Sequence, residues 1–234
     1  MECFVLGVDP GANGGAVLLY PGLPARCAAA WVWKKRTRSG LPVWEVRSLI
    51  MGQLGPTRRV APMVAVAELI RESARTITGG RAYLLGCEDQ QVQRNAATAL
   101  ATARTAGRLI APLEPLAQEM SCELVRASVW RYDLLGLNPN TGRDTAKEAA
   151  VRGMPLRIQG LGVAIQRIRG GAEAADAAGV AEWVRLNVNS TCPEVQQIEW
   201  ALNTHPKRAR KGRKKRAAPR FMRMDLAREP WRPR

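Results

Sequence analysis

The chain opens with two apolar segments joined by a turn rich in proline and glycine, a pattern that predicts a buried β-hairpin. Residues 3–9 are expected to form one strand and residues 14–20 its partner, with Pro10 and Gly11 in the turn. The first segment ends in a single acid, Asp9. A buried hairpin does not need a carboxylate there, so Asp9 is a candidate for chemistry, although Asp-Pro-Gly alone is also an ordinary turn signal.

The remaining patterns alternate between strands and helices, which predicts an α/β fold. Further strands are expected over 27–33, 82–88 and 122–127, and helices over 63–78, 93–110, 144–151 and 172–187. Residues 40–60 hold Gly, Pro and Arg and are expected to form an irregular connection. The 234 residues suffice for one sizeable domain and an appendage.

Positive charge is concentrated at the C-terminus. The chain carries a formal net charge of +16, and residues 205–234 hold most of the excess. Such a basic tail favours nucleic acid as a partner, because phosphate contacts release condensed counterions; a solubilising tail or a nuclear localisation signal is the alternative. The expected DNA-binding residues of the tail are Lys207, Arg208, Arg210, Lys211, Arg213, Lys214, Lys215 and Arg216.

A second basic run follows the strand expected over 27–33. Trp31 and Trp33 share one face of that strand and are interpreted as packing residues, and Trp130 and Trp183 are expected in the core. The run directly after the strand is expected to contact DNA from a hairpin and consists of Lys34, Lys35 and Arg36.

The scarcity of histidine limits the kinds of catalytic site that the chain can form. The one histidine, His205, lies at the start of the basic tail, so histidine-based triads and zinc sites are not expected in the folded part. Hydrolytic chemistry must then use carboxylates, which select hard cations such as Mg²⁺ or Mn²⁺. The five cysteines are scattered and are expected to be reduced thiols of a cytoplasmic protein: Cys3, Cys27, Cys87, Cys122 and Cys192. No apolar run suggests a membrane span, and no signal peptide is expected.

Four carboxylates are positioned to converge. Asp9 and Glu88 each end an apolar strand, and acids at neighbouring strand ends meet at one edge of a sheet. Glu173 and Asp176 lie three residues apart on one face of the helix over 172–187, in line with apolar residues, although a solvated helix face is the alternative. Four carboxylates around two cations are typical of two-metal phosphodiester hydrolysis.

These motifs, in this order, resemble the RuvC-type Holliday junction resolvases of the RNase-H-like superfamily. The resemblance spans about residues 3–187 and rests on V-L-G-V-D-P-G-A-N-G-G-A, on C-E-D-Q at the second strand end, on the Ala-rich helix with Asn95 near its start, and on E-A-A-D-A-A. The segments 125–137 and 144–150 are similar to phage-borne members.

The resemblance implies an RNase-H-like mixed central sheet flanked by helices over residues 1–190. A connecting segment is expected over 191–204, before the basic tail over 205–234. The resemblance also implies a homodimeric endonuclease for four-way junctions and other branched DNA, with two Mg²⁺ per site and Mn²⁺ as a substitute. The metal positions are expected at Asp9, Glu88, Glu173 and Asp176, and a catalytic basic position near the scissile phosphate at Lys147.

Two departures from the family pattern remain open. Glu173 stands where many members have Asp, so Asp89 is an alternative ligand. The aromatic residue that bacterial members carry after the second acid is absent. Two other functions also stay open: an ATP-binding protein of the actin/Hsp70/sugar-kinase fold, which normally needs a longer chain, and a non-catalytic DNA-binding protein.

Overall fold

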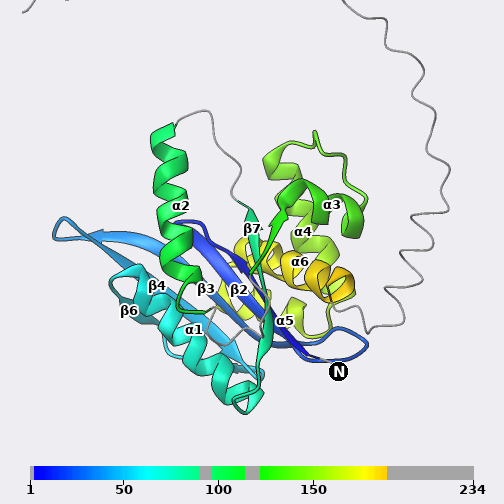
Figure 1. The fold of residues 1–234 in the computed structure, drawn as a ribbon, viewed down its shortest axis with the longest axis horizontal. Helices are drawn as coiled ribbons and strands as arrows, with labels where there is room; N and C mark the ends of the chain where they lie inside the picture. The colour runs from blue at the N-terminus through cyan, green and yellow to red at the C-terminus, as the bar shows by residue number, and fades with distance from the viewer. Residues whose placement is uncertain (1–2, 90–95, 114–121, 189–234) are drawn as a thin grey trace, which may run out of the picture.

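The computed structural model describes residues 3–89, 96–113 and 122–188 as an α/β fold (Figure 1), which confirms the predicted class. Eight strands form one mixed sheet in these residues: β1 (Phe4–Asp9), β2 (Asn13–Leu19), β3 (Cys27–Arg38), β4 (Leu41–Ile50), β5 (Gln53–Leu54), β6 (Arg58–Val60), β7 (Tyr83–Asp89) and β8 (Glu123–Arg126). Six helices accompany them: α1 (Met63–Thr78), α2 (Ala96–Ile110), α3 (Ala127–Leu135), α4 (Arg143–Arg157), α5 (Leu161–Ile168) and α6 (Gly171–Asn187).

The strand order places the ends of β1 and β7 side by side. The sheet runs β5-β4-β3-β2-β1-β7-β8, with β6 paired to the outer part of β4. Strands β1 to β4 are antiparallel neighbours, whereas β7 lies parallel to β1 and β8 parallel to β7. The carboxyl ends of β1, β7 and β8 therefore share one edge of the sheet.

Helices cover the two faces of the sheet in two groups (Figure 1). We call the side that carries Val5, Val17 and Val32 the α6 face, because these residues share a core cluster with buried residues of α3 to α6. The opposite side, the α1 face, carries Leu6, Leu18 and Trp33, which share a second cluster with residues of α1 and α2. None of the helices in the described ranges is long and apolar enough to span a membrane.

Small residues allow α6 to lie almost directly on the sheet. A Cβ atom added to Gly7 would collide with the backbone carbonyl of Ala177, and one added to Gly15 would lie 2.5 Å from that of Glu173. The Ala- and Gly-rich composition of this helix predicts such close packing, and the structure confirms it. Burial follows the same pattern, since Ala174, Ala177 and Ala181 are inaccessible to solvent.

Several predicted elements need correction. Residues 40–60 are not irregular: they form β4, β5 and β6, because Trp44, Val46 and Leu49 are buried along a strand that pairs with β3 over its whole length. Strand β3 also continues to Arg38, so the basic run lies within it rather than after it. The short helices α3 and α5 are absent from the prediction, and α4 continues to Arg157 rather than ending at 151.

The tryptophans are placed largely as predicted. Trp31, Trp33 and Trp130 are fully buried, which confirms their interpretation as core residues. Trp183 is only partly buried, because its indole Nε1 donates a hydrogen bond to Asp133 Oδ2 at 2.7 Å near the surface.

Among the described residues, Cys27, Cys87 and Cys122 are free thiols. Some positions singled out in the sequence lie outside the described residues: Asn95, Cys192, His205, the connection over 191–204 and the basic tail.

Candidate active site

Three of the predicted acids converge in one cleft on the α6 face. The pairing of Val8 with Cys87 places Asp9 beside Glu88 on neighbouring parallel strands. Asp176 reaches the same cleft from the first half of α6, and the cleft has a volume of about 270 Å³. Asp9 and Asp176 are 7% and 1% exposed, so the carboxylates are largely removed from solvent.

The turn that carries Asp9 is held from both sides. The backbone N–H of Gly11 donates to Asp9 Oδ1 at 3.4 Å, which orients the carboxylate. Trp33, from the core of the α1 face, donates its indole Nε1 to the carbonyl oxygen of Gly11 at 3.0 Å. The glycine-rich turn therefore has a fixed shape, because a buried side chain of β3 is hydrogen-bonded to its backbone.

Two consecutive residues of α3 hold the other two acids. Trp130 Nε1 donates to Glu88 Oε2 at 3.3 Å, and Arg131 Nη2 donates to Asp176 Oδ1 at 2.9 Å. The guanidinium of Arg131 also lies 5.0 Å from the ring centre of Trp130. The sequence patterns identify Trp130 only as a core residue and do not single out Arg131; a tryptophan and an arginine side by side, close to a strand end, are the one signal that could have pointed to them.

Basic side chains line the cleft beside the acids. Lys147 Nζ lies 3.8 Å from Asp176 Oδ2, and Arg131 and Arg143 also line the cleft. Glu148, the residue after Lys147, pairs with Arg152 instead, so Lys147 is directed to the acids and not to its neighbour. A cleft with both carboxylates and cations has the chemistry to bind a metal–phosphate unit.

Burial raises the pKa of each of the three converging acids, Asp9, Glu88 and Asp176. The pKa of Asp9 lies well above its usual range, first because the group is buried and then because Glu88 and Asp176 are negatively charged. Burial and the charge of Asp176 likewise raise the pKa of Glu88 from 4.5 to about 7, although Arg131 and the Trp130 hydrogen bond oppose the shift. Burial also raises the pKa of Asp176 in spite of its ion pair with Arg131. The fully ionised cluster therefore needs additional positive charge.

The fourth expected ligand, Glu173, lies at the edge of this arrangement. It sits one turn before Asp176 and is partly buried, and its charge contributes to the raised pKa of Asp176. Its side chain is not among those that line the cleft, whereas Asp89 does line it. Asp89 lies 3.8 Å from Arg126 in a loose, exposed ion pair, which leaves its carboxylate free to turn.

The donor set has the chemistry of a site for Mg²⁺ or Mn²⁺. Carboxylate oxygens are the ligands that these hard cations prefer, and mutual repulsion between buried acids favours a bound cation. In the described ranges, no three such side chains are arranged as a ready-made metal shell. The oxygens of Asp176 are directed to Arg131 and Lys147.

The predicted DNA-binding residues of the folded part lie outside the cleft. Lys34, Lys35 and Arg36 are exposed on the outer half of β3. A larger cavity of about 540 Å³ lies on the α1 face between β4 and α1, but among the described residues that line it only Arg58 and Glu72 carry a charge. The cleft with the three acids is therefore the better candidate for chemistry.

No protein-family model matches the chain, and no curated protein sequence matches it significantly.

Proposed function

We propose that the protein is a metal-dependent endonuclease that hydrolyses phosphodiester bonds in branched DNA, with four-way junctions as its main substrate. The observation that carries the proposal is the convergence of Asp9, Glu88 and Asp176, all buried or nearly so and all with raised pKa values, in a cleft that also holds cationic side chains. A purely structural cluster has no reason to bury three acids together, because each raises the free energy of ionising the others.

The acids would hold two Mg²⁺ ions, or Mn²⁺ in their place. Asp9, Glu88 and Asp176 are the proposed ligands, with Glu173 or Asp89 completing the set. When bound, the cations polarise the scissile phosphodiester and stabilise the charge that develops on it.

The other residues of the cleft orient the acids and bind the phosphate. Trp130 fixes one oxygen of Glu88 through its hydrogen bond, which leaves the other oxygen free for a ligand. Lys147 and Arg131 contact Asp176 and can share their positive charge with a phosphate oxygen. Lys147 is the better phosphate contact, because its ammonium lies 3.8 Å from the acid whereas Arg131 is hydrogen-bonded to it at 2.9 Å.

The fold is compatible with this proposal. A mixed sheet in which antiparallel strands are followed by parallel ones, with helices on both faces, agrees with the RNase-H-like arrangement that the sequence motifs suggest. The proposal includes a homodimer, because a four-way junction offers two equivalent strands and symmetric cutting needs two sites. It also includes a contribution of the tail over 205–234 to general DNA affinity.

The direct test incubates the full chain with a synthetic four-way junction, with and without Mg²⁺, beside a linear duplex of the same sequence. Symmetric nicks in the junction that require Mg²⁺ and are absent from the duplex are the expected result. Binding without any cutting in Mg²⁺ or Mn²⁺ would refute the endonuclease and favour a non-catalytic DNA-binding protein. Light scattering of the protein–junction complex would test the dimer.

A further inference from the structure

The β3–β4 hairpin extends beyond the helices that cover the α6 face (Figure 1). The start of α6 lies on Val32, because a Cβ atom added to Gly170 would come within 2.7 Å of a methyl carbon of Val32. From residue 34 to the turn at residues 39–40, every residue of β3 is exposed. The described helices therefore leave the outer half of this face open.

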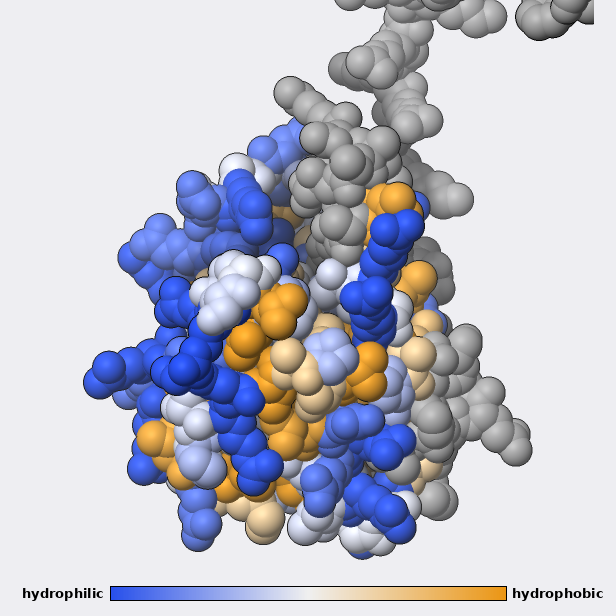
Figure 2. Space-filling model, turned by 90° about the vertical axis from the view of Figure 1, so that its left-hand side faces the viewer, coloured by the Kyte–Doolittle hydropathy of each residue, from blue (hydrophilic) through white to orange (hydrophobic). Residues whose placement is uncertain are grey.

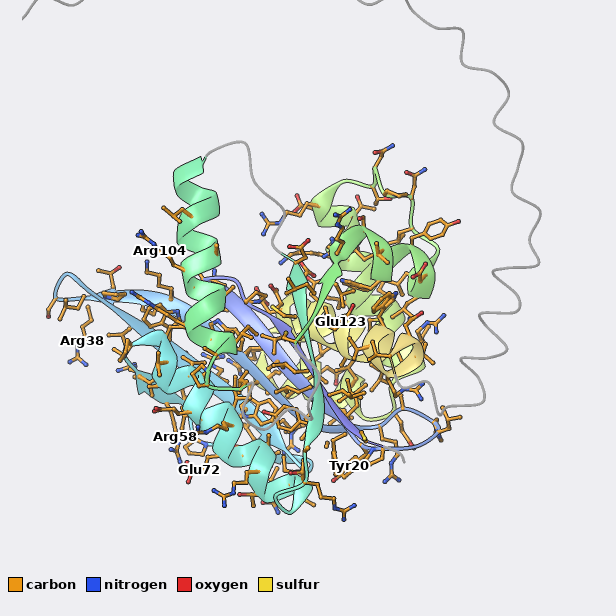
Figure 3. The ribbon with its side chains drawn as sticks, viewed as in Figure 1. Tyr20, Arg38, Arg58, Glu72, Arg104 and Glu123 are labelled. Carbon is orange, nitrogen blue, oxygen red and sulfur yellow. The ribbon has the colours of Figure 1, made fainter. Side chains whose placement is uncertain are left out.

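The register of the strands places a group of cations on that open face. Side chains alternate along β3, so Lys34, Arg36 and Arg38 point to the same side as Val32. Lys34 pairs with Glu45, which pairs in turn with Arg59 of β6, so Arg59 lies on this face as well. Figure 3 shows Arg38 at the projecting hairpin, at the far end of this group.

The hairpin has one carboxylate among these cations. Glu45 is the only acid within β3, β4 and β6, and it accepts a hydrogen bond from Arg47 Nη2 at 2.8 Å. That hydrogen bond, with the charges of Arg36 and Arg59, lowers the pKa of Glu45. One acid cannot neutralise the cations around it, so the face keeps a positive charge. The end of the molecule that carries the hairpin has a correspondingly hydrophilic rim around an apolar region (Figure 2).

The cationic face is continuous with the cleft. Asp9 pairs with Gly15, and Gly15 pairs with Val32, so these three residues lie in one row across the sheet. Lys34, which pairs with Asn13, lies two residues further along β3 than Val32. At about 3.3 Å per residue, Arg38 lies about 20 Å further along the strand direction than Val32. That length corresponds to about six base pairs of duplex DNA at about 3.4 Å each.

We infer that Lys34, Arg36, Arg38 and Arg59 form a phosphate-binding track that holds a duplex arm of the DNA beside the cleft. The inference rests on the proposed function, since it assigns the track to the same substrate. A rigid polyanion fits an open, extended row of cations that repeats every second residue, and phosphate contacts set position without reading sequence. Lys35 lies on the opposite face, paired with Trp44, and has no part in the track.

Two variants of the full chain, each with three positive charges removed, distinguish binding by the track from a general effect of net charge. The track variant combines Lys34→Gln, Arg36→Gln and Arg38→Gln. The control combines Lys35→Gln, Arg58→Gln and Arg75→Gln, which removes three exposed cations from the α1 face and from α1. Binding to a labelled junction and to a linear duplex is measured by fluorescence anisotropy between about 50 and 300 mM salt, without divalent cations so that no DNA is cut.

The track variant should bind both DNAs at least about tenfold more weakly at low salt, and the slope of log affinity against log salt should fall by about 2.7, or about 0.9 for each lost phosphate contact. The control should lose about twofold with almost the same slope as wild type. Equal losses in both variants would mean that only net charge matters, and unchanged binding in the track variant would mean that its cations are merely solvated. Either result would overturn the inference.

Duplex length gives a second readout. The defect of the track variant should shrink to that of a single lost contact with duplexes that end about three base pairs from the cut, because such DNA reaches Lys34 but not Arg36 and Arg38. A defect that stays the same at every length would overturn the track. In Mg²⁺, a chain that binds through the track but cuts no junction would refute the endonuclease alone. Equal cutting of junctions by the track variant and the control variant would refute the track alone.

Discussion

The cleft and the outer half of the β3–β4 hairpin lie on the same face of one sheet but are stabilised in opposite ways. In the cleft, Asp9 and Asp176 are buried and fixed by hydrogen bonds, and burial raises their pKa values. On the hairpin, Lys34 and Arg36 are exposed, and the one carboxylate, Glu45, has a lowered pKa. The positions of the acids in the cleft therefore depend on packing, whereas the positions of the charged side chains on the hairpin depend only on strand register.

Removing one acid from each region should have very different effects on catalysis. Asp9→Asn should lower the rate of junction cleavage by about a thousandfold or more, because it removes a metal ligand from the cluster. Glu45→Gln, the matched change on the hairpin, should cut at nearly the wild-type rate at saturating junction. Single-turnover cleavage on a denaturing gel measures both, and a fully active Asp9→Asn would refute the site.

Packing under the cleft should be equally sensitive. Gly7→Ala should lower the free energy of unfolding by about 2–3 kcal/mol, because the added methyl group meets the backbone of α6 at Ala177. Gly107→Ala is the control: its Cβ has open space in α2, and it should stabilise the protein by about 0.5–1 kcal/mol. Urea denaturation followed by circular dichroism gives both values. A neutral Gly7→Ala would mean that α6 can move away from β1 without loss.

The pH dependence of stability should have opposite signs in the two regions. Without metal, the folded state keeps Glu88 protonated up to about pH 7, whereas the unfolded chain ionises it near 4.5. The folded state therefore binds more protons in this window, and stability falls as pH rises through it. The lowered pKa of Glu45 acts the other way: its contribution is present above pH 4.5 and is lost as pH falls.

Glu88→Gln should accordingly be more stable than wild type at about pH 7.5 by about 3 kcal/mol, and about equal to it near pH 4.5. Glu45→Gln should be slightly less stable than wild type at the higher pH. Thermal unfolding in EDTA at the two pH values tests both variants. Adding Mg²⁺ should then raise the Tm of wild type at the higher pH more than that of Glu88→Gln. A Glu88→Gln variant that gains no stability over wild type as the pH rises would contradict the repulsion between the acids.

The sequence patterns predict the acids better than the residues that support them. Asp9 and Glu88 end strongly apolar strands, and Asp176 interrupts a small-residue helix, so each breaks a clear local pattern. Trp130 and Arg131 break none, because α3 spans only nine residues and its apolar positions do not form a regular stripe. Their contacts with Glu88 and Asp176 depend on how distant segments pack, which local periodicity does not contain.

The sequence patterns also miss the β3–β4 hairpin, for a different reason. The glycines and prolines of residues 40–60 are typical of loops, yet pairing with the long strand β3 overrides these local preferences. Charge alone also treats Lys34, Lys35 and Arg36 as one group. Only the register of β3 with β2 and β4 shows that Lys35 lies on the other face.

The spread of the acids along the chain has a consequence during synthesis. Asp9 and Glu88 meet as soon as β1 and β7 pair, but Asp176 arrives only with α6, the last described helix. A nascent chain still short of α6 has two of the three carboxylates and lacks the helix that covers the sheet beneath them. The ribosome therefore releases almost the whole domain before the cluster is complete, and no shorter fragment carries it. Under the proposed function, a chain that stops before α6 would therefore lack one of the three metal-binding acids and would not cut DNA.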